Sequence, residues 1–342
     1  MTDLLNNVFL AISDVMQNPV LSSVLAIVFG PLATFGLYWL LNKLVSLIPN
    51  QKVRNAIEPY AVIGVVLLLV GGLLVGPTIQ TTVFSFMNAD STEFVGFKNY
   101  FKLFADPNFF ITIRNNLLWI AVVPLVTIVL GLLIATLTDK LGKAREQIFK
   151  SIIFMPMAIS FVAASSIWRL NYMWDSGDKQ IGTLNALIKA VGLTPVNWIQ
   201  NDTFALNSLM LMVIVIWANA GFAMTLLSAA VKAVPEETIE AAAIDGATGA
   251  QAFFRVVLPQ IWGTVISVFI TVLISSMKIF DVIWGMTGGN FHTNVLGVDF
   301  FLQYFIYLNT GKASAIVVLL MLAIIPIMIY QIRSYRKQEE IR

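Results

Sequence analysis

Long runs of apolar residues without a charged side chain recur along the sequence. Seven runs have at least 18 residues and contain no Asp, Glu, Lys or Arg. Crossing about 30 Å of hydrocarbon takes roughly 20 helical residues, because each residue of an α-helix rises about 1.5 Å. The pattern therefore predicts an all-α integral membrane protein with seven membrane-spanning helices. The runs are 15–42, 59–89, 115–138, 151–168, 203–231, 256–277 and 313–332.

A further apolar segment, 282–298, is interrupted by Thr287-Gly288-Gly289-Asn290 and contains the single histidine, His292. We interpret it as the end of one helix followed by a loop at the outer surface. The expected helices are an N-terminal span at 20–41 and core spans at 60–84, 115–138, 148–170, 204–231, 262–286 and 313–333. Prolines inside spans predict kinks, which a bilayer tolerates when neighbouring groups satisfy the freed carbonyl. These prolines are Pro77, Pro124, Pro156 and Pro326.

The composition supports a membrane location. Hydrophobic residues make up 58% of the 342 residues and charged residues only 12%, whereas a soluble domain carries about 25% charged residues. The formal net charge of +2 argues against nucleic acid as a partner, since nucleic-acid-binding proteins usually have a clustered basic face. With no cysteine and one histidine, the chain is expected to have no soft metal site, no haem ligand pair and no cofactor.

The distribution of Lys and Arg predicts the orientation. Four segments on one side of the spans contain 13 Lys or Arg, and the segments on the other side contain 7. The richer segments are assigned to the cytoplasm, which places the C-terminus inside and the N-terminus outside. Residues 1–19 have no Lys or Arg, which argues against a cleavable signal peptide and favours a permanent first helix. The cytoplasmic segments are 42–58, 139–150, 232–261 and 333–342.

The segment 232–261 has the most specific sequence, and its first half predicts a short helix. Pro235 fits the first helical position, where its missing N–H costs nothing. Glu236 and Glu237 fall in the first turn, where they complement the helix dipole. Gly246 is placed to end the helix in a left-handed conformation.

The second half of this segment predicts another helix after a sharp corner. Thr248 and Gln251 have the spacing of a capping box, and Pro259 precedes the next span. A rigid helix exposed on the cytoplasmic side is expected to be a binding site for another protein. The alternative, a helix resting on the lipid surface, is less favoured because such helices are usually basic with bulky apolar faces, and this one is acidic and alanine-rich.

The residues of this segment resemble the signature loop of the inner-membrane permeases of binding-protein-dependent ABC importers. The matching positions are Glu240-Ala241-Ala242, Gly246, Val256 and Leu258-Pro259. The resemblance covers most of 93–333. Within the family, the chain is most similar to the carbohydrate branch, in particular to the maltose-type subunit with an added N-terminal helix. The other matching stretches are Val95 to Tyr100, Gly182 to Asn185, Gly192-Leu193, Trp198, Phe280-Asp281 and Thr287 to Gly289.

The resemblance implies a domain organisation. Residues 1–55 would form the extra transmembrane helix and a basic loop. Residues 56–342 would form a six-helix permease core with the coupling loop 232–261 and outer loops 85–114 and 171–203. Within the second outer loop, helical spacing of apolar residues predicts a short surface helix. These residues are Leu184, Leu187, Ile188 and Val191.

The resemblance also implies a function and partners. The chain would move a sugar, such as an α-glucoside or another di- or oligosaccharide, across the bacterial inner membrane. Its partners would be a second permease subunit, two ATPase subunits holding ATP and Mg, a soluble or lipid-anchored sugar-binding protein, and membrane lipid. The chain has no Gly-x-x-x-x-Gly-Lys-Ser/Thr motif, so it is not expected to bind ATP itself or to be an enzyme.

Two groups of site residues follow from the resemblance. The ATPase-coupling group would be Glu236, Glu240, Ala241, Ala242, Asp245, Gly246, Leu258 and Pro259. Pathway-facing positions would be Asn219, Phe222, Ser276 and Ile279, followed by Trp217 and Trp284. Polar residues in spans often only bond a neighbouring helix, so a packing role stays open. Lys278 and Asp281 are three residues apart and are expected to form an ion pair, which we interpret as structural.

Other classes explain the sequence less well. A self-contained secondary transporter would predict inverted repeats and a broken-helix ion site, and the chain shows no internal repeat. An electron-transfer subunit conflicts with one histidine and no cysteine. Within the importer class, amino acids, phosphate or a glycerol phosphodiester are alternative solutes. An anion would require paired Arg or Lys residues in the spans, and apart from Lys278 the core spans contain almost none.

Overall fold

The computed structural model describes residues 19–177 and 181–340. Regular secondary structure within these ranges is helical throughout, and the strand-like pairing in them is an isolated bridge between Met87 and Phe94. The predicted all-α fold class is confirmed. The chain folds as two compact units, Met1–Gln80 and Thr81–Arg342.

The described part of the first unit is a helical hairpin. α2 (Pro19–Ser46) packs against α3 (Gln51–Val70), and a π-helical segment, η1 (Gly71–Val75), continues α3. Asn50 caps α3 by accepting a hydrogen bond from the amide of Lys52 at 3.0 Å. Most large apolar residues of the hairpin are exposed, as expected for helices whose solvent is lipid.

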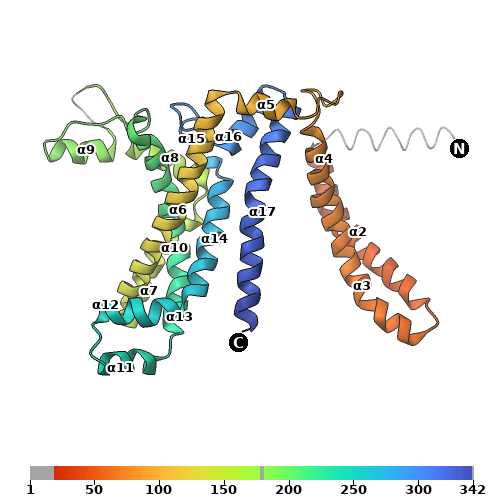
Figure 1. The fold of residues 1–342 in the computed structure, drawn as a ribbon, viewed down its shortest axis with the longest axis horizontal. Coiled ribbons are helices and arrows are strands. Elements are labelled where there is room, and N and C mark those ends of the chain that lie inside the picture. Colours follow the sequence, from red (N-terminus) through yellow and green to blue (C-terminus); the bar gives the residue numbers. More distant parts are fainter. Residues whose placement is uncertain (1–18, 178–180, 341–342) are drawn as a thin grey trace. The chain divides into compact units, whose positions relative to one another are not determined.

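The second unit contains the remaining helices, apart from the first residues of α4 (Gly76–Phe84), which starts in the first unit. Figure 1 shows α11, α12 and α13 at one end of the unit and α5, α9, α15 and α16 at the other. In chain order they are α5 (Lys98–Phe104), α6 (Pro107–Asp139), α7 (Lys143–Phe154), η2 (Met155–Ala158), α8 (Phe161–Asn171), α9 (Thr183–Ala190), η3 (Thr203–Ala205), α10 (Leu206–Lys232), α11 (Glu236–Ile244), α12 (Gly249–Ala252), η4 (Phe253–Val257), α13 (Leu258–Gln260), α14 (Trp262–Met277), α15 (Asp281–Met286), α16 (Leu296–Phe301), η5 (Leu302–Ile306) and α17 (Thr310–Glu340).

Five helices in the described ranges are long and apolar enough to cross a membrane, and two further pairs qualify only as bent pairs. The α7–η2 segment meets α8 at 103°, and the segment from α12 to α13 meets α14 at 73°. Seven crossings result only if each bent pair crosses the membrane once. The first positions of the apolar run 15–42, up to residue 18, lie outside the described residues.

Two of the expected spans are each interrupted in the structure. The expected span 148–170 bends after η2, and the proline kink is confirmed at Pro156, which lies in that 3-10 helix. The expected span 262–286 ends its first helix at Met277, and α15 begins only at Asp281. In contrast, α6 continues through Pro124, because a proline removes only one hydrogen bond of a long helix that its neighbours support.

The centre of the second unit is the packing of α6, α10 and α14. A Cβ atom at Gly131 of α6 would lie 2.8 Å from the Cβ of Ala223 on α10. A Cβ atom at Gly221 would lie 2.6 Å from the carbonyl oxygen of Ile153 on α7. Such small residues let helix backbones approach closely, which is how helices associate where no water drives them together.

The segment 171–203, which is predicted to be an outer loop, is organised around one buried side chain. Asn185, on α9, donates hydrogen bonds to the carbonyls of Met173 and Val196 and accepts them from the amide of Val196 and the indole of Trp198. The predicted short helix in this segment is confirmed as α9. Of its predicted apolar face, Leu187 is exposed and Leu184 packs against the core.

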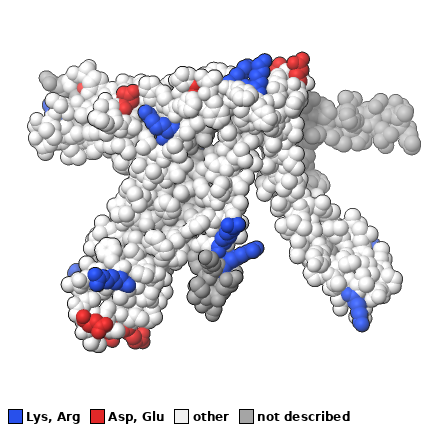
Figure 2. Space-filling view, viewed as in Figure 1, with Lys and Arg blue, Asp and Glu red and all other residues white. Residues whose placement is uncertain are grey.

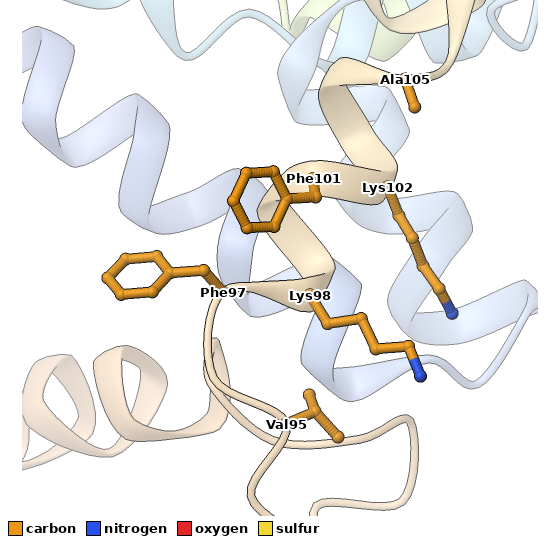
Figure 3. Close-up of a pocket in the computed structure, with 6 residues that line it drawn as sticks. All are labelled: Val95, Phe97, Lys98, Phe101, Lys102 and Ala105. Atoms are coloured by element: carbon orange, nitrogen blue, oxygen red, sulfur yellow. The ribbon is translucent and has the colours of Figure 1, made fainter.

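The segment 85–114, which is predicted to be an outer loop, contains α5, and α6 already begins at Pro107, inside this segment. Asn99 anchors α5 through hydrogen bonds from its side chain to the carbonyl oxygens of Ser85 and Met87, at 2.9 and 2.7 Å. Phe97 and Phe101 project from one side of α5, and its two lysines project from the other (Figure 3). These lysines are Lys98 and Lys102.

Candidate functional site

The predicted first helix of the coupling loop forms, one residue later than expected. Pro235 is the N-cap residue, with φ −59° and ψ 132°, and the first helical residue of α11 is Glu236. Glu236 and Glu237 lie in the first turn, where negative charge is stabilised by the helix dipole. The helix ends at Ile244, with Asp245 as its C-cap residue.

The corner after α11 depends on Gly246, which has a left-handed backbone with φ +82°. Its N–H donates to the carbonyl of Ala243 at 3.0 Å, and the N–H of Ala247 donates to the carbonyl of Ala242 at 2.9 Å. Glycine favours this type of helix end because it has no Cβ to strain the left-handed conformation. The predicted conformation of Gly246 is therefore confirmed.

The second helix of the loop begins with the predicted capping box. The side chain of Gln251 accepts a hydrogen bond from the amide of Thr248 at 2.8 Å, and the Thr248 hydroxyl accepts one from the amide of Gln251 at 3.3 Å. The segment continues through η4 into α13, which contains Leu258 and Pro259. Leu258 packs against the core, Pro259 is exposed, and the 73° bend into α14 follows.

One side of α11 is tied to the rest of the chain. Ile239 on α11 and Val234, just before the helix, pack against the main apolar core. The hydroxyl of Thr238 accepts a hydrogen bond from the side chain of Gln260 at 3.4 Å. These contacts fix α11 on the segment that runs into α14.

The other side of α11 is free. None of its nine residues is buried, and Glu240 and Ala241 are exposed. Acidic side chains gather at this end of the unit (Figure 2). Ile244, at the C-terminal end of the helix, is 86% exposed, and it belongs to this surface although the motif points only to its small and acidic neighbours. The signal for it is a large aliphatic residue on an acidic, alanine-rich helix.

The predicted pathway residues of α10 are both half-buried. The side-chain amide of Asn219 donates to the carbonyl of Val215, one turn earlier in its own helix, at 2.9 Å. Phe222 packs against the core. Asn219 thus keeps its carbonyl oxygen for another partner.

The predicted pathway residues near the end of α14 are buried. Ser276 is 1% exposed and its hydroxyl donates to the carbonyl of Val272 at 2.8 Å. Ile279 lies in the break between α14 and α15, and it is 5% exposed within the main core. A pathway role for these two residues requires the surrounding helices to separate.

The remaining span residues singled out from the sequence lie in aromatic packing or at the helix break. Trp217 contacts Trp168 edge to face, with ring centroids 5.7 Å apart, and Trp284 stacks on Phe280 at 5.9 Å. The expected ion pair between Lys278 and Asp281 is not formed, although both residues belong to the described part of the chain. The break between α14 and α15 separates them.

Asparagine side chains hold the outer segment between α15 and α16 in place, and the sequence did not single them out. Asn115 on α6 donates to the carbonyls of His292 and Asn294, at 2.6 and 2.9 Å. Asn116 accepts a hydrogen bond from the amide of Leu296 at 2.7 Å, and Asn207 on α10 donates to the carbonyl of Phe291 at 2.7 Å. The partners are up to 180 residues apart in sequence, so no local pattern reveals them.

The single histidine links two segments that are predicted to lie at the outer surface. The Nδ1 atom of His292 lies 2.8 Å from a carboxylate oxygen of Asp202, and both side chains are more than half exposed. The hydrogen bond from His292 lowers the pKa of Asp202. In the residues that the structure describes, no group of three or more His, Asp or Glu could hold a metal ion.

Comparison with known proteins identifies the family. The family of binding-protein-dependent transport system inner membrane components matches residues 127–338. The osmoprotective compounds uptake permease protein GgtC of Synechocystis is 44% identical over 81% of this chain and 98% of its own length. The alpha-glucoside transport system permease protein AglF of Rhizobium meliloti is 39% identical over 93% of this chain and 98% of its own length.

A solved structure has the same fold. It is a bacterial ABC transporter involved in the import of the acidic polysaccharide alginate, and it superposes with a TM-score of 0.71 at 20% identity over 84% of this chain and 99% of that chain. The matches do not favour a self-contained secondary transporter. The chain therefore belongs to the family of inner-membrane components of binding-protein-dependent transport systems, as a multi-pass permease of an ABC importer.

Proposed function

We propose that this permease carries a sugar, in the form of an α-glucoside or another di- or oligosaccharide, by alternating access. The observation that carries the solute class is its 39% identity, over 93% of this chain, to a permease named for alpha-glucoside transport. The uncharged runs 203–231 and 256–277 agree with a neutral solute, because an anion crossing the bilayer would require basic partners there. A small osmoprotective compound is the second candidate, since the relative at 44% identity is named for such uptake.

The permease is proposed to act in a complex. Its partners are a second permease subunit, two ATPase subunits that bind ATP and Mg, and a soluble or lipid-anchored sugar-binding protein. The chain itself is the non-catalytic transport component, and ATP hydrolysis takes place on the ATPase chains. A solved transporter of the same fold contains a periplasmic protein bound to an alginate pentasaccharide, which supports a binding protein as a partner.

The free surface of α11 is proposed to seat in a groove of one ATPase subunit. Small residues at Ala241 and Ala242 allow close approach, and Glu236 and Glu240 supply charge. Gly246 sets the corner that presents the helix, together with Asp245. Leu258 and Pro259 connect it to α14. ATP-driven closure of the ATPases then favours one of two global states of the spans, through differential binding.

The solute pathway is proposed to run past Asn219, Phe222, Ser276 and Ile279. An aromatic ring and neutral hydrogen-bonding groups suit a sugar, which presents hydroxyl groups and apolar ring faces. The burial of the two α14-side residues agrees with a pathway that is closed in this conformation. Opening it would expose them together with Asn219, whose carbonyl oxygen is available.

The N-terminus is proposed to lie outside and the C-terminus in the cytoplasm. Figure 1 places the C-terminal end of α17 at the same end of the second unit as α11. A shared side is required if α11 meets a cytoplasmic ATPase and the tail obeys the excess of Lys and Arg on cytoplasmic segments.

Uptake by cells tests the solute class. Cells lacking this chain would be compared with cells carrying it, using labelled maltose, sucrose and trehalose, with labelled glycine betaine in parallel. The proposal expects binding-protein-dependent uptake of at least one α-glucoside, lost on deletion and restored by the chain. Uptake of betaine alone would favour the second candidate. Identical uptake of every probe in both cells would sink both candidates.

A further inference from the structure

The proposed cytoplasmic ends of three helices meet in a group of charged side chains and one serine. The group includes Lys232, the first residue of the coupling loop, but none of the predicted coupling or pathway residues. Asp139 ends α6, Glu146 and Lys150 lie on α7, and Ser228 and Lys232 lie in the last turns of α10. We call these five residues the charge cluster. Its members come from three separate helices. Residues 140–142 join α6 directly to α7, whereas α10 is distant from both in sequence, so the cluster adds a charged link between the end of α10 and this pair.

Glu146 is the centre of the charge cluster. Its side chain is only 11% exposed, and its carboxylate contacts the ammonium groups of both Lys150 and Lys232, the second at 2.6 Å. Lys150 also donates to the hydroxyl of Ser228. A carboxylate taken out of water is stable only when it is paired and hydrogen-bonded, and Glu146 meets both conditions.

Lys232 is the member of the charge cluster that contacts residues on two other helices. Its Nζ atom lies 2.6 Å from Glu146 on α7 and 3.6 Å from the carboxylate of Asp139 on α6. It is the last residue of α10, where a positive charge also complements the helix dipole. One side chain therefore ties the end of α10 to both neighbouring helices.

Lys232 is also next to the coupling helix. Residues 233–235 separate it from Glu236, the first residue of α11, and four extended steps of the chain span no more than about 14 Å. A displacement of α11 along or across its axis therefore pulls on Lys232. Through Glu146, the same displacement reaches α7, which leads into the 103° bend before α8.

We propose that Lys232 is a positioning residue that makes α7 and the end of α6 move together with the coupling helix α11, through its ion pairs with Glu146 and Asp139. This inference rests on the proposed contact between α11 and an ATPase. Without the ion pairs, α7 and α10 stay linked by packing and by the hydrogen bond from Lys150 to Ser228, and the bent helix pair α7–α8 follows α11 less closely. The consequence is ATP hydrolysis that is less completely converted into transport.

The variant Lys232→Met separates this role from folding. Glu146 keeps its contact with Lys150 in this variant, so the buried carboxylate stays paired. Lys232→Arg retains the charge and serves as the conservative rescue. Lys140→Met removes the same charge from the neighbouring segment 139–150, at an exposed position that forms no ion pair with the described residues, and is the matched control.

Two distances measured by spin labelling in the assembled transporter test the proposal. The natural chain has no cysteine, so cysteines can be introduced in pairs without background. The first pair, Glu237→Cys with Gln147→Cys, reports α11 against α7, and the second, Glu237→Cys with Ile332→Cys, reports α11 against α17. These three residues are exposed and are not among the predicted coupling residues. Each distance is measured with and without ATP in EDTA, once in the natural background and once in the Lys232→Met background.

The expected result has two parts. ATP changes the α11–α17 distance, while the α11–α7 distance stays constant in the natural background. In Lys232→Met the α11–α7 distribution broadens or shifts with ATP, and solute transported per ATP falls about two- to fivefold, the range that a half-exposed ion pair supports. Lys232→Arg and Lys140→Met behave like the natural chain in both measurements.

Other outcomes overturn the proposal. An α11–α7 distance that changes with ATP in the natural chain, or one that is unaffected by Lys232→Met, shows that the ion pairs do not link the two helices. If the α11–α17 distance does not change when ATP is added, α11 does not move and Lys232 has no movement to transmit. Purification without any ATPase would instead overturn the proposed function itself, so the two failures are distinguishable.

Discussion

The amide nitrogen of Ala247 lies 2.9 Å from the carbonyl oxygen of Ala242, and this hydrogen bond closes the end of α11 around Gly246. A bond of this kind is possible only when the residue before Ala247 turns into the left-handed region. The direction in which the chain leaves α11 therefore depends on the backbone of one residue, Gly246. It is a geometric requirement that a substitution can test.

Gly246→Ala should weaken coupling. No atom within 4 Å would obstruct the new Cβ, but φ is +82°, and a left-handed backbone costs a residue with a Cβ about 1–2 kcal/mol. This cost destabilises the present orientation of α11, and the ratio of correctly oriented to re-oriented helix falls by roughly five- to thirtyfold. Binding-protein-stimulated ATPase activity is expected to fall with that ratio. Gly249→Ala, which also meets no atom within 4 Å and has no positive φ, should leave the activity unchanged. Equal effects of the two variants would contradict this account of the corner.

Gly221→Ala should destabilise the helix packing. Its Cβ would lie 2.6 Å from the backbone oxygen of Ile153, a neighbour that cannot rotate away, and overpacking of this kind costs about 1–3 kcal/mol. The measurement is thermal unfolding of the purified permease in detergent, where a lower midpoint is expected. Gly36→Ala, with nothing within 4 Å of its Cβ, is the control and should unfold like the natural chain. A midpoint that does not move in Gly221→Ala would show that α7 and α10 are not packed this closely.

Asn115→Ala should loosen the outer segment between α15 and α16. The variant leaves the carbonyls of His292 and Asn294 without their donor, and an unmade buried hydrogen bond costs about 1–3 kcal/mol. Hydrogen exchange of the amides in 288–296 should therefore become faster, by at least about fivefold. Asn171→Ala, which removes only a bond to its own helix at Ile167, should leave these amides unchanged. Unaltered exchange in Asn115→Ala would mean that other contacts hold the segment.

Local features were predictable from the sequence, and features that depend on distant partners were not. The left-handed Gly246 and the capping box of Thr248 and Gln251 follow from residues within a few positions of one another. The 103° bend after η2 depends on what packs around it, so the proline alone predicted a kink but not its size. The pairing of Lys232 with Glu146 joins residues that are far apart in sequence, and only the folded chain brings them together.

The same contrast applies within the candidate site. The acidic and small residues of α11 carry a recognisable motif, whereas the exposure of Ile244 is visible only once the helix is placed on the surface. Pro235 is partly predictable from the sequence. Its presence predicted a helix start, but whether it is the N-cap or the first helical residue differs by one peptide unit, which is within the usual uncertainty of helix ends.

The contact between α11 and an ATPase is the central claim, and a cross-link tests it most directly. The chain has no cysteine of its own, so Ile244→Cys provides a single thiol on the exposed end of α11. Membranes carrying this variant would be treated with a short thiol-to-amine cross-linker, and the products would be identified by mass spectrometry. The account predicts a cross-linked product containing an ATP-hydrolysing subunit, formed with Ile244→Cys and not with a thiol at the opposite end of the unit, in Phe97→Cys. Recovery of the uncross-linked chain alone, with transport intact after Gly246→Ala, would contradict it.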